Sequence, residues 1–176
     1  MRSGEVNILE TDRLSLRQLR VDDAPFMLGL LNEPSFVQNI GDRGVRTLEG
    51  AREYILRGAV ASYEQNGYGL YLVELKAIAV PIGICGLVKR PYLVDADVGF
   101  AFLPLYWAQG YALEAAAAVM DYARVTLGIE RVVAIVAPDN HASCRLLRKI
   151  GLQFEAMIDA PDPGHRCALF TPARAP

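Results

Sequence analysis

The sequence predicts one α/β (α+β) domain in which helices flank a central sheet. Its 176 residues are 52% hydrophobic and carry a formal net charge of −2, a balance typical of a compact domain with a sizeable core. Segments with the strand period of two alternate along the chain with segments whose apolar residues recur every three or four positions, as on helices. No internal repeat or linker interrupts this order, so we expect a single domain over residues 1–176, with its core at about residues 8–171.

The first third of the chain predicts a strand followed by two helices. Residues 13–19 alternate apolar and polar side chains as a half-buried strand does. Asp22 and Asp23 then precede a helix, as capping residues do. Residues 47–65 have helical character, with Thr47 as the cap.

The middle of the chain predicts a meander of strands and then a long helix. Residues 70–75 and 80–88 favour strands, and residues 98–103 follow after a turn, so we expect the last two to pair antiparallel. From residue 112 to residue 127 the apolar positions lie three or four apart. This spacing predicts a helix with one buried stripe, ending at Gly128.

The remaining residues predict a strand, a helix and two more strands. Residues 131–137 form a short apolar run, Asn140 stands at the start of the next helix and Gly151 at its end. Strands are expected at residues 152–158 and 167–170, with a loop at residues 160–164 between them.

Composition excludes several classes of function. No block of Lys and Arg is present to neutralise a nucleic-acid backbone, so we expect no nucleic-acid partner. No apolar run reaches the roughly 20 residues that span a bilayer, and the N-terminus lacks a signal-peptide pattern, so we expect a cytoplasmic protein without a membrane partner. Cys85, Cys144 and Cys167 are widely spaced and only two His are present, which predicts reduced cysteines and no metal site.

The turn before the long helix is the strongest candidate for a ligand site. Residues 107–112 read Trp-Ala-Gln-Gly-Tyr-Ala, a turn made largely of small residues. The first backbone N–H groups of a helix have no partner and lie at the positive end of its dipole, so such a turn can bind an anion closely. The Lys-Ser/Thr pair of a P-loop and the GxGxxG pattern are both missing, which argues against ATP or NAD. Alternatively, the small residues only permit a tight turn.

Four ordered blocks of sequence resemble a known family. They are Thr11-Asp12-Arg13-Leu14-Ser15-Leu16-Arg17, Trp107 to Ala112 with Glu114-Ala115, Asn140-His141-Ala142-Ser143, and Lys149-Ile150-Gly151-Leu152. With the order of elements, these blocks resemble the GNAT superfamily of N-acetyltransferases, in the branch typified by the ribosomal-protein alanine N-acetyltransferases RimJ and RimL. The resemblance implies a mixed, mostly antiparallel sheet of about six to seven strands, flanked by about four helices and splayed at the middle to admit acetyl-CoA.

The resemblance also assigns residues to acetyl-CoA. The family's pyrophosphate turn maps onto Trp107, Gly110 and Ala112, although Trp107 departs from the usual Gln or Arg. Since such a turn binds mainly through backbone N–H groups, the expected phosphate contacts are Gln109, Gly110, Tyr111, Ala112 and Leu113. By analogy, the backbones of Phe102 and Leu103 contact the pantetheine arm. Asn140 and Ser143 are expected at its thiol end, although Asn140 could serve only as a helix cap.

Acetyl transfer requires a route for the amine proton and a hydrogen-bond donor for the leaving thiolate. The Tyr that many of these enzymes place seven residues after the Asn is Leu147 here. Ser143 is therefore the predicted donor to the sulfur, and Asp97 the predicted base, acting directly or through water. The alternatives are a small helix residue at position 143 and a solvated turn residue at position 97. Glu114 is expected to have a structural role.

The resemblance favours direct transfer of the acetyl group to a primary amine in a ternary complex. A protein or peptide N-terminal α-amine is the expected acceptor, with a small-molecule amine such as a polyamine or antibiotic as the alternative. A non-catalytic acyl-CoA-binding sensor would have the same anion-binding turn at residues 107–112, which we call the cradle, and it remains an alternative function. Acceptor contacts are expected in the loops at residues 32–46 and 160–164, and an exposed last strand would allow a homodimer.

Overall fold

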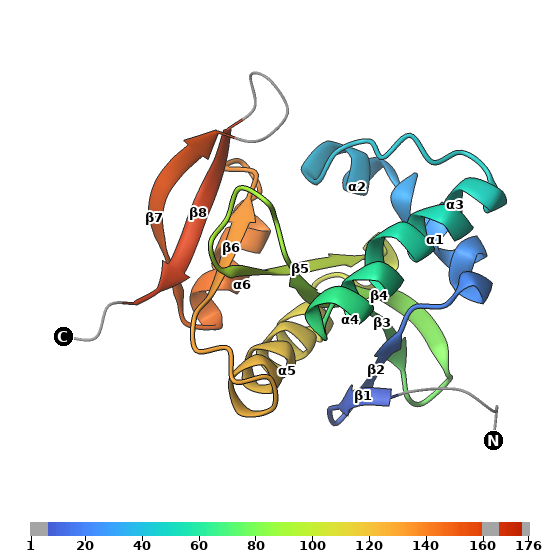
Figure 1. Cartoon of the computed structure of the whole chain (residues 1–176), viewed down its shortest axis with the longest axis horizontal. Coiled ribbons are helices and arrows are strands. Elements are labelled where there is room, and N and C mark those ends of the chain that lie inside the picture. Colours follow the sequence, from blue (N-terminus) through green and yellow to red (C-terminus); the bar gives the residue numbers. More distant parts are fainter. Residues whose placement is uncertain (1–6, 160–165, 174–176) are drawn as a thin grey trace.

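The computed structural model describes residues 7–159 and 166–173, and it is built on one eight-stranded sheet (Figure 1). The strands are β1 (Asn7–Glu10), β2 (Leu14–Gln18), β3 (Leu70–Leu75), β4 (Val80–Val88), β5 (Ala96–Phe102), β6 (Val132–Val136), β7 (Leu152–Asp159) and β8 (Arg166–Pro172). Their order across the sheet is β1-β2-β3-β4-β5-β6-β8-β7. All neighbours are antiparallel except β5 and β6, so the sheet is mixed and mostly antiparallel, as predicted.

The helices fall into an N-terminal group and a later pair. The first group is α1 (Ala24–Leu31), α2 (Pro34–Asn39), α3 (Leu48–Ile55) and α4 (Ala61–Asn66), and the later pair is α5 (Tyr111–Val125) and α6 (His141–Lys149). A π-helical turn at Leu56–Val60 joins α3 to α4, so the helical region predicted for residues 47–65 is continuous. No helix within the described ranges is long and apolar enough to cross a membrane.

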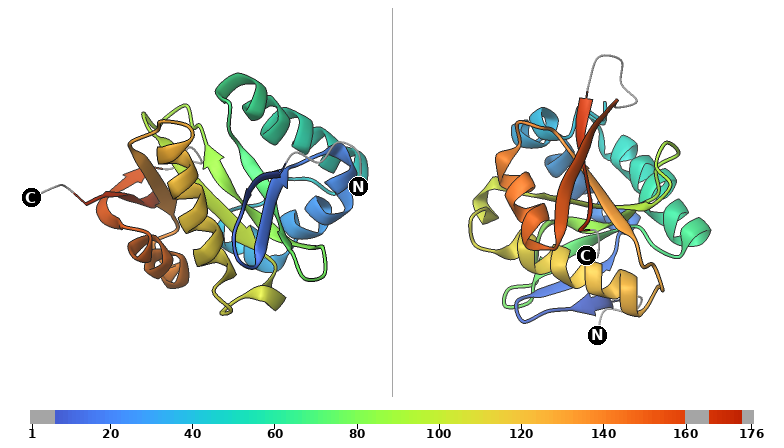
Figure 2. Two further views of the ribbon diagram at one scale, coloured as in Figure 1. Left: turned by 90° about the horizontal axis from the view of Figure 1, so that it is seen from below. Right: turned by 90° about the vertical axis from the view of Figure 1, so that its left-hand side faces the viewer.

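The sheet has helices on both faces (Figure 2) and separates two hydrophobic cores. Apolar side chains of α5 and α6, such as Val119 and Leu147, pack against one face together with Val98 from β5. The other face of β3 and β4 is covered by α1 and α3, with Leu72 and Ile84 from the sheet. Side chains alternate between the faces of a strand, so each central strand contributes to both cores.

The parallel pair β5 and β6 separates soon after it begins. Only Ala96↔Val132 and Asp97↔Val133 are paired, and beyond these positions the strands diverge (Figure 1). Beyond Asp97, the edge of β5 that faces β6 therefore has no strand partner, whereas its other edge is bonded to β4. We call the space between the two diverging strand backbones the gap. The splayed sheet that the family resemblance implies is confirmed.

Several predicted details were wrong. Asp23 stands at the start of α1, but its carboxylate accepts hydrogen bonds from the buried Arg17 side chain, at 2.8 and 2.9 Å, instead of capping the helix. The segment at residues 32–46 contains α2, which was expected to be loop. The last strand, β8, lies between β6 and β7 and is therefore not an exposed edge. The predicted loop at residues 160–164 lies outside the described residues.

Candidate functional site

The turn before α5 presents a row of backbone N–H groups. Gly110 has a φ of +83° and Ala108 a φ of +58°, so the chain takes left-handed conformations as it enters the helix. Within the described ranges, the N–H groups of residues 108–113 donate no hydrogen bond to the protein. The row includes all the residues predicted to contact phosphate, from Gln109 to Leu113. Such a row at a helix N-terminus can bind an anionic group.

Arg13 and Thr11, from the N-terminal part of the chain, bind this turn. The Thr11 hydroxyl and the Arg13 backbone N–H donate to Glu114 Oε1, at 2.5 and 3.0 Å. Arg13 Nε donates to Glu114 Oε2 at 2.7 Å, and its Nη1 donates to the Gln109 carbonyl at 3.0 Å. The guanidinium also lies over the Tyr111 ring, 4.4 Å from its centroid. We call Thr11, Arg13 and Glu114 the cradle clamp.

The clamp explains why the pKa of Glu114 is lowered. Burial opposes its ionisation, but the hydrogen bonds from Thr11 and Arg13 outweigh that effect and lower the pKa of Glu114 below its ordinary value. Both carboxylate oxygens accept hydrogen bonds from Thr11 or Arg13, which fits the structural role expected for Glu114. The sequence showed these residues within the family-like blocks, but it did not show that the two blocks meet in space.

A Cβ at Gly110 would have little room. It would lie 3.2 Å from Nη2 of Arg13, and the positive φ disfavours any L side chain. The clamp and the glycine together keep the backbone exposed at the turn. The residues present therefore fit the close approach of a pyrophosphate, which is the part of acetyl-CoA that the resemblance assigns to this turn.

Trp107, which stands in place of the usual first residue of the family's turn, makes a hydrogen bond within the protein. Its indole Nε1 donates to the Phe102 carbonyl at 2.8 Å, which ties the turn to the end of β5. The side chain remains 49% exposed, so it forms an edge of the site without being buried.

The two backbones predicted to contact the pantetheine arm differ in their availability. The Leu103 N–H donates to the Ile82 carbonyl at 3.0 Å, and its carbonyl accepts from Tyr106 at 2.9 Å. Successive residues of a strand direct their N–H groups to opposite sides, so the Phe102 N–H faces the gap beside β6. Phe102 is therefore the better placed of the two.

Asn140 and Ser143 meet at the start of α6. Asn140 Oδ1 accepts a hydrogen bond from the Ser143 N–H at 3.1 Å, which is the cap predicted from the sequence. The cap leaves the Asn140 side-chain NH₂ and the Ser143 hydroxyl without partners among the described residues. Leu147, at the position of the missing Tyr, is buried in the core and contributes no polar group.

Asp97 lies at the last paired position of β5 and β6 and is 1% exposed, so it is not a solvated turn residue. Its Oδ1 accepts from the Ile135 backbone N–H at 3.1 Å, and its Oδ2 accepts from Arg90 Nε at 2.5 Å. Burial raises the pKa of Asp97, and the Arg90 guanidinium and the Ile135 N–H offset this only in part. Nothing in the sequence indicated Arg90 as its partner.

A family comparison identifies this arrangement. The sequence model described as "Acetyltransferase (GNAT) domain" matches residues 13–153, which include the cradle, the splayed strands and Ser143. The chain belongs to the GNAT acetyltransferase family. It is accordingly an acyltransferase enzyme with a GNAT fold, and acetyl-CoA is the donor that this family uses.

Individual GNAT proteins are similar over most of the chain. The uncharacterized N-acetyltransferase YoaA of Bacillus subtilis (strain 168) is 32% identical over 153 residues, which are 86% of this chain and 85% of YoaA. A crystal structure of an acetyltransferase from Agrobacterium tumefaciens has a TM-score of 0.78 at 24% identity, covering 94% of each chain. RimL, a ribosomal L7/L12 alpha-N-protein acetyltransferase in complex with coenzyme A, has a TM-score of 0.79 at 21% identity and covers 94% of this chain and 97% of RimL. At such identities these structures show the fold alone.

The predicted site residues of the GNAT domain therefore fall into two groups. The turn at residues 108–113 and the Phe102 N–H follow the part of β5 that no longer pairs with β6, and Ser143 lies in the first turn of α6, the helix that follows β6. Asp97 lies where those strands are still paired, and its carboxylate accepts a hydrogen bond from Arg90. Within the described parts of the chain, no group of three His, Cys, Asp or Glu side chains could hold a metal ion.

Proposed function

We propose that this chain is a cytoplasmic N-acetyltransferase that transfers the acetyl group of acetyl-CoA directly to the N-terminal α-amine of a protein or peptide. The observation that carries the proposal is the row of unpartnered N–H groups at residues 108–113, held open by the cradle clamp beside a splayed sheet. When bound, acetyl-CoA supplies an activated thioester. The remaining chemistry is assigned to the side chains and backbone of the chain.

The residues have complementary roles in this proposal. The N–H groups of Gln109 to Leu113 bind the pyrophosphate, and the Phe102 N–H and the Asn140 side chain orient the pantetheine arm. The Ser143 hydroxyl donates a hydrogen bond to the leaving sulfur, which stabilises negative charge there without a full charge on the protein. Asp97 accepts the amine proton through water, because both its oxygens are already bonded to protein groups.

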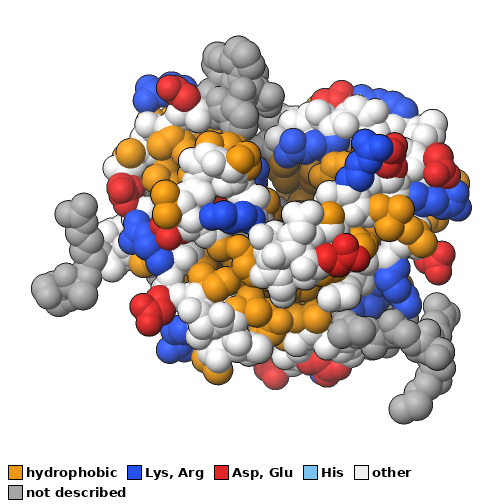
Figure 3. Space-filling view, viewed as in Figure 1, with side chains coloured by type: hydrophobic (Ala, Val, Ile, Leu, Met, Phe, Trp, Pro, Cys, Tyr) orange, Lys and Arg blue, Asp and Glu red, His pale blue; other side chains and the backbone are white. Residues whose placement is uncertain are grey.

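The choice of a peptide acceptor rests on similarity to RimL, which is named as an alpha-N-protein acetyltransferase. Direct transfer requires the amine to reach the gap from the side opposite the donor. Figure 3 shows a face of the molecule with a hollow between the C-terminal strands and α2, lined by hydrophobic side chains. The segment at residues 32–46, which includes α2, is therefore assigned to acceptor contact. Small amines are the alternative acceptors.

Calorimetric titration with acetyl-CoA tests the cradle. We expect micromolar binding to the native chain, weakened at least tenfold by Gly110→Ala, because a Cβ would strain the turn and crowd Arg13. Gly128→Ala is the matched control, since Gly128 follows the C-terminus of the same helix with a φ of +66° and has nothing within 4 Å of its Cβ position. Equal binding by both variants, or equal binding of ATP and NAD, would contradict the proposal.

Ser143→Ala separates an enzyme from an acyl-CoA sensor. The hydroxyl has no hydrogen-bond partner among the described residues, so its removal should leave folding unchanged and acetyl-CoA affinity within about twofold, because the hydroxyl's bond to the sulfur strengthens only as charge develops. In an enzyme we expect turnover to fall about tenfold to a hundredfold, because a donor to the developing charge is lost. The measurement is CoA release with a panel of amines and N-terminal peptides. Wild-type turnover in the variant would remove Ser143 from the mechanism.

A further inference from the structure

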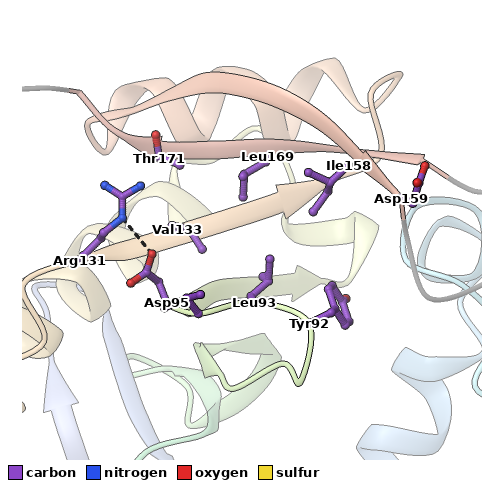
Figure 4. A pocket seen from close by; sticks show the side chains of 10 residues that line it. Tyr92, Leu93, Asp95, Arg131, Val133, Ile158, Asp159, Leu169 and Thr171 are labelled. Atoms are coloured by element: carbon purple, nitrogen blue, oxygen red, sulfur yellow. Dashed lines mark hydrogen bonds and ion pairs between the residues drawn. The ribbon is translucent and has the colours of Figure 1, made fainter.

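A cavity of about 350 Å³ lies on the face of the sheet opposite α5 (Figure 4). Its walls come from the segment between β4 and β5, from β6 and from the β7–β8 hairpin, through Leu93, Val133, Ile158 and Leu169. Val132 and Ala134 belong to the core beneath α5, so Val133 between them faces the other way. The same alternation places Leu169 on the cavity face, between the core residues Ala168 and Phe170.

The cavity adjoins the narrow end of the gap between β5 and β6. Val133 is the strand partner of Asp97. Leu169 is the partner of Ile135, whose N–H donates to the Asp97 carboxylate. An amine that loses its proton to Asp97 through water would therefore place its neighbouring substituent at this cavity.

At one end of the cavity, the polar groups are already paired with protein groups. Arg131 Nε donates to Asp95 Oδ2 at 2.9 Å at one end, as Figure 4 shows. The Thr171 hydroxyl donates to Glu155 Oε2 at 2.6 Å. A second ammonium group would thus find no unpaired carboxylate at this end, and its desolvation would be costly. At the other end, the Asp159 side chain is 92% exposed and lies 3.6 Å from Arg166 Nε, so a charged group that reached it would stay in solvent and outside the apolar part of the cavity. The aliphatic walls instead favour an uncharged apolar group.

From this geometry we infer that the cavity binds the first side chain of the acceptor peptide and selects an apolar one. The inference rests on the proposed function, because it requires the α-amine to react beside Asp97. The volume of about 350 Å³ is larger than one aliphatic side chain, so the choice of an apolar group rests on the apolar walls and not on size. The acceptor is accordingly an N-terminus that begins with an apolar residue such as leucine.

Three peptides that differ only in their first residue test this specificity. With the native chain, we expect kcat/KM for a leucine-first peptide to exceed that for a glycine-first or lysine-first peptide by about tenfold or more. Leu169→Trp, which narrows the cavity, should reduce this preference without changing acetyl-CoA affinity. Val125→Trp is the matched control, because Val125 is 74% exposed on α5 and lies outside the site. Circular dichroism checks that each variant is folded.

A second variant and a binding measurement keep the test independent of catalysis. Ile158→Ala removes an aliphatic wall of the cavity and should weaken the preference for leucine-first peptides. Calorimetry with CoA present should show leucine-first binding that Leu169→Trp weakens. Such binding without turnover on any amine would support the cavity and overturn the catalytic proposal. Turnover without preference for leucine, or unchanged by both variants, would overturn the cavity and leave the acetyltransferase intact.

Discussion

Asp97 shows how tertiary contacts decide the role of a single charged residue. The carboxylate is almost fully buried, accepts hydrogen bonds from Ile135 and Arg90, and has a raised pKa because of its burial. A base must be deprotonated to act, so kcat/KM should fall as the pH is lowered through this raised pKa. This acidic limb lies above the pH at which an exposed aspartate titrates.

Asp97→Asn should remove that acidic limb and lower kcat about a hundredfold, because the amide cannot accept a proton. Its oxygen can still accept from the Ile135 N–H, but its NH₂ would face the Arg90 Nε donor, so circular dichroism first checks that the variant is folded. Acetyl-CoA affinity should remain unchanged, because residue 97 is not part of the turn at residues 108–113. The measurement is the pH profile of CoA release for both proteins with one acceptor. If the variant kept the wild-type limb, the titrating group would be the acceptor amine or another residue.

Local sequence predicted residues that interact with near neighbours, and it failed for those with distant partners. The Asn140 cap involves an N–H three residues away, and Thr47 likewise accepts from the Gly50 N–H, so both were predictable. The prediction that Asp23 caps a helix was wrong because its carboxylate accepts a hydrogen bond from Arg17, which is six residues earlier and buried in a strand. No pattern around Asp97 reveals its side-chain partner, since that contact depends on how the segment before β5 folds.

The cradle clamp joins the loop before β2 to the first turn of α5. Replacing Arg13 by Ala or Glu114 by Gln should raise the Kd for acetyl-CoA about fivefold, because the turn loses its support while its N–H groups remain. In a double-mutant cycle the two changes should couple by about 1 kcal/mol in the free energy of unfolding, as expected for a partly exposed ion pair with several hydrogen bonds.

Asp121→Asn provides the matched control for the clamp. Asp121 forms an ion pair with Arg124 at 3.2 Å near the other end of α5, and both side chains are exposed. Its loss should leave acetyl-CoA affinity unchanged. Additive effects of the Arg13 and Glu114 changes would show that the clamp residues act separately.

At the scale of elements, the long periodic segments were predicted correctly and the short ones were missed. α5 and the strands from β3 to β8 lie within a few residues of their predicted ranges. β1 has four residues and α2 has six, too few for a clear period. Such short elements depend on packing against neighbours, which a local pattern does not contain.

Across the whole molecule, the gap between β5 and β6 divides the sheet into two parts that acetyl-CoA would bridge. Binding to the folded state alone should stabilise the protein by about 2.7 kcal/mol at one hundred times the Kd. For a domain of this size, that corresponds to a rise in Tm of about 5 to 10 °C. Thermal unfolding with acetyl-CoA, and with ATP as the control, measures the effect. No shift, or an equal shift with ATP, would contradict the assignment.

The order of the C-terminal strands was beyond sequence reasoning, because pairing between distant segments leaves no local pattern. β8 follows β7 along the chain but lies between β7 and β6 in the sheet. During synthesis, β6 therefore has no neighbour on that side until residues 166–172 have left the ribosome. The wall of the cavity beside Asp97 can close only then, so under the inferred role of the cavity a nascent chain that still lacks β8 would not yet select its acceptor.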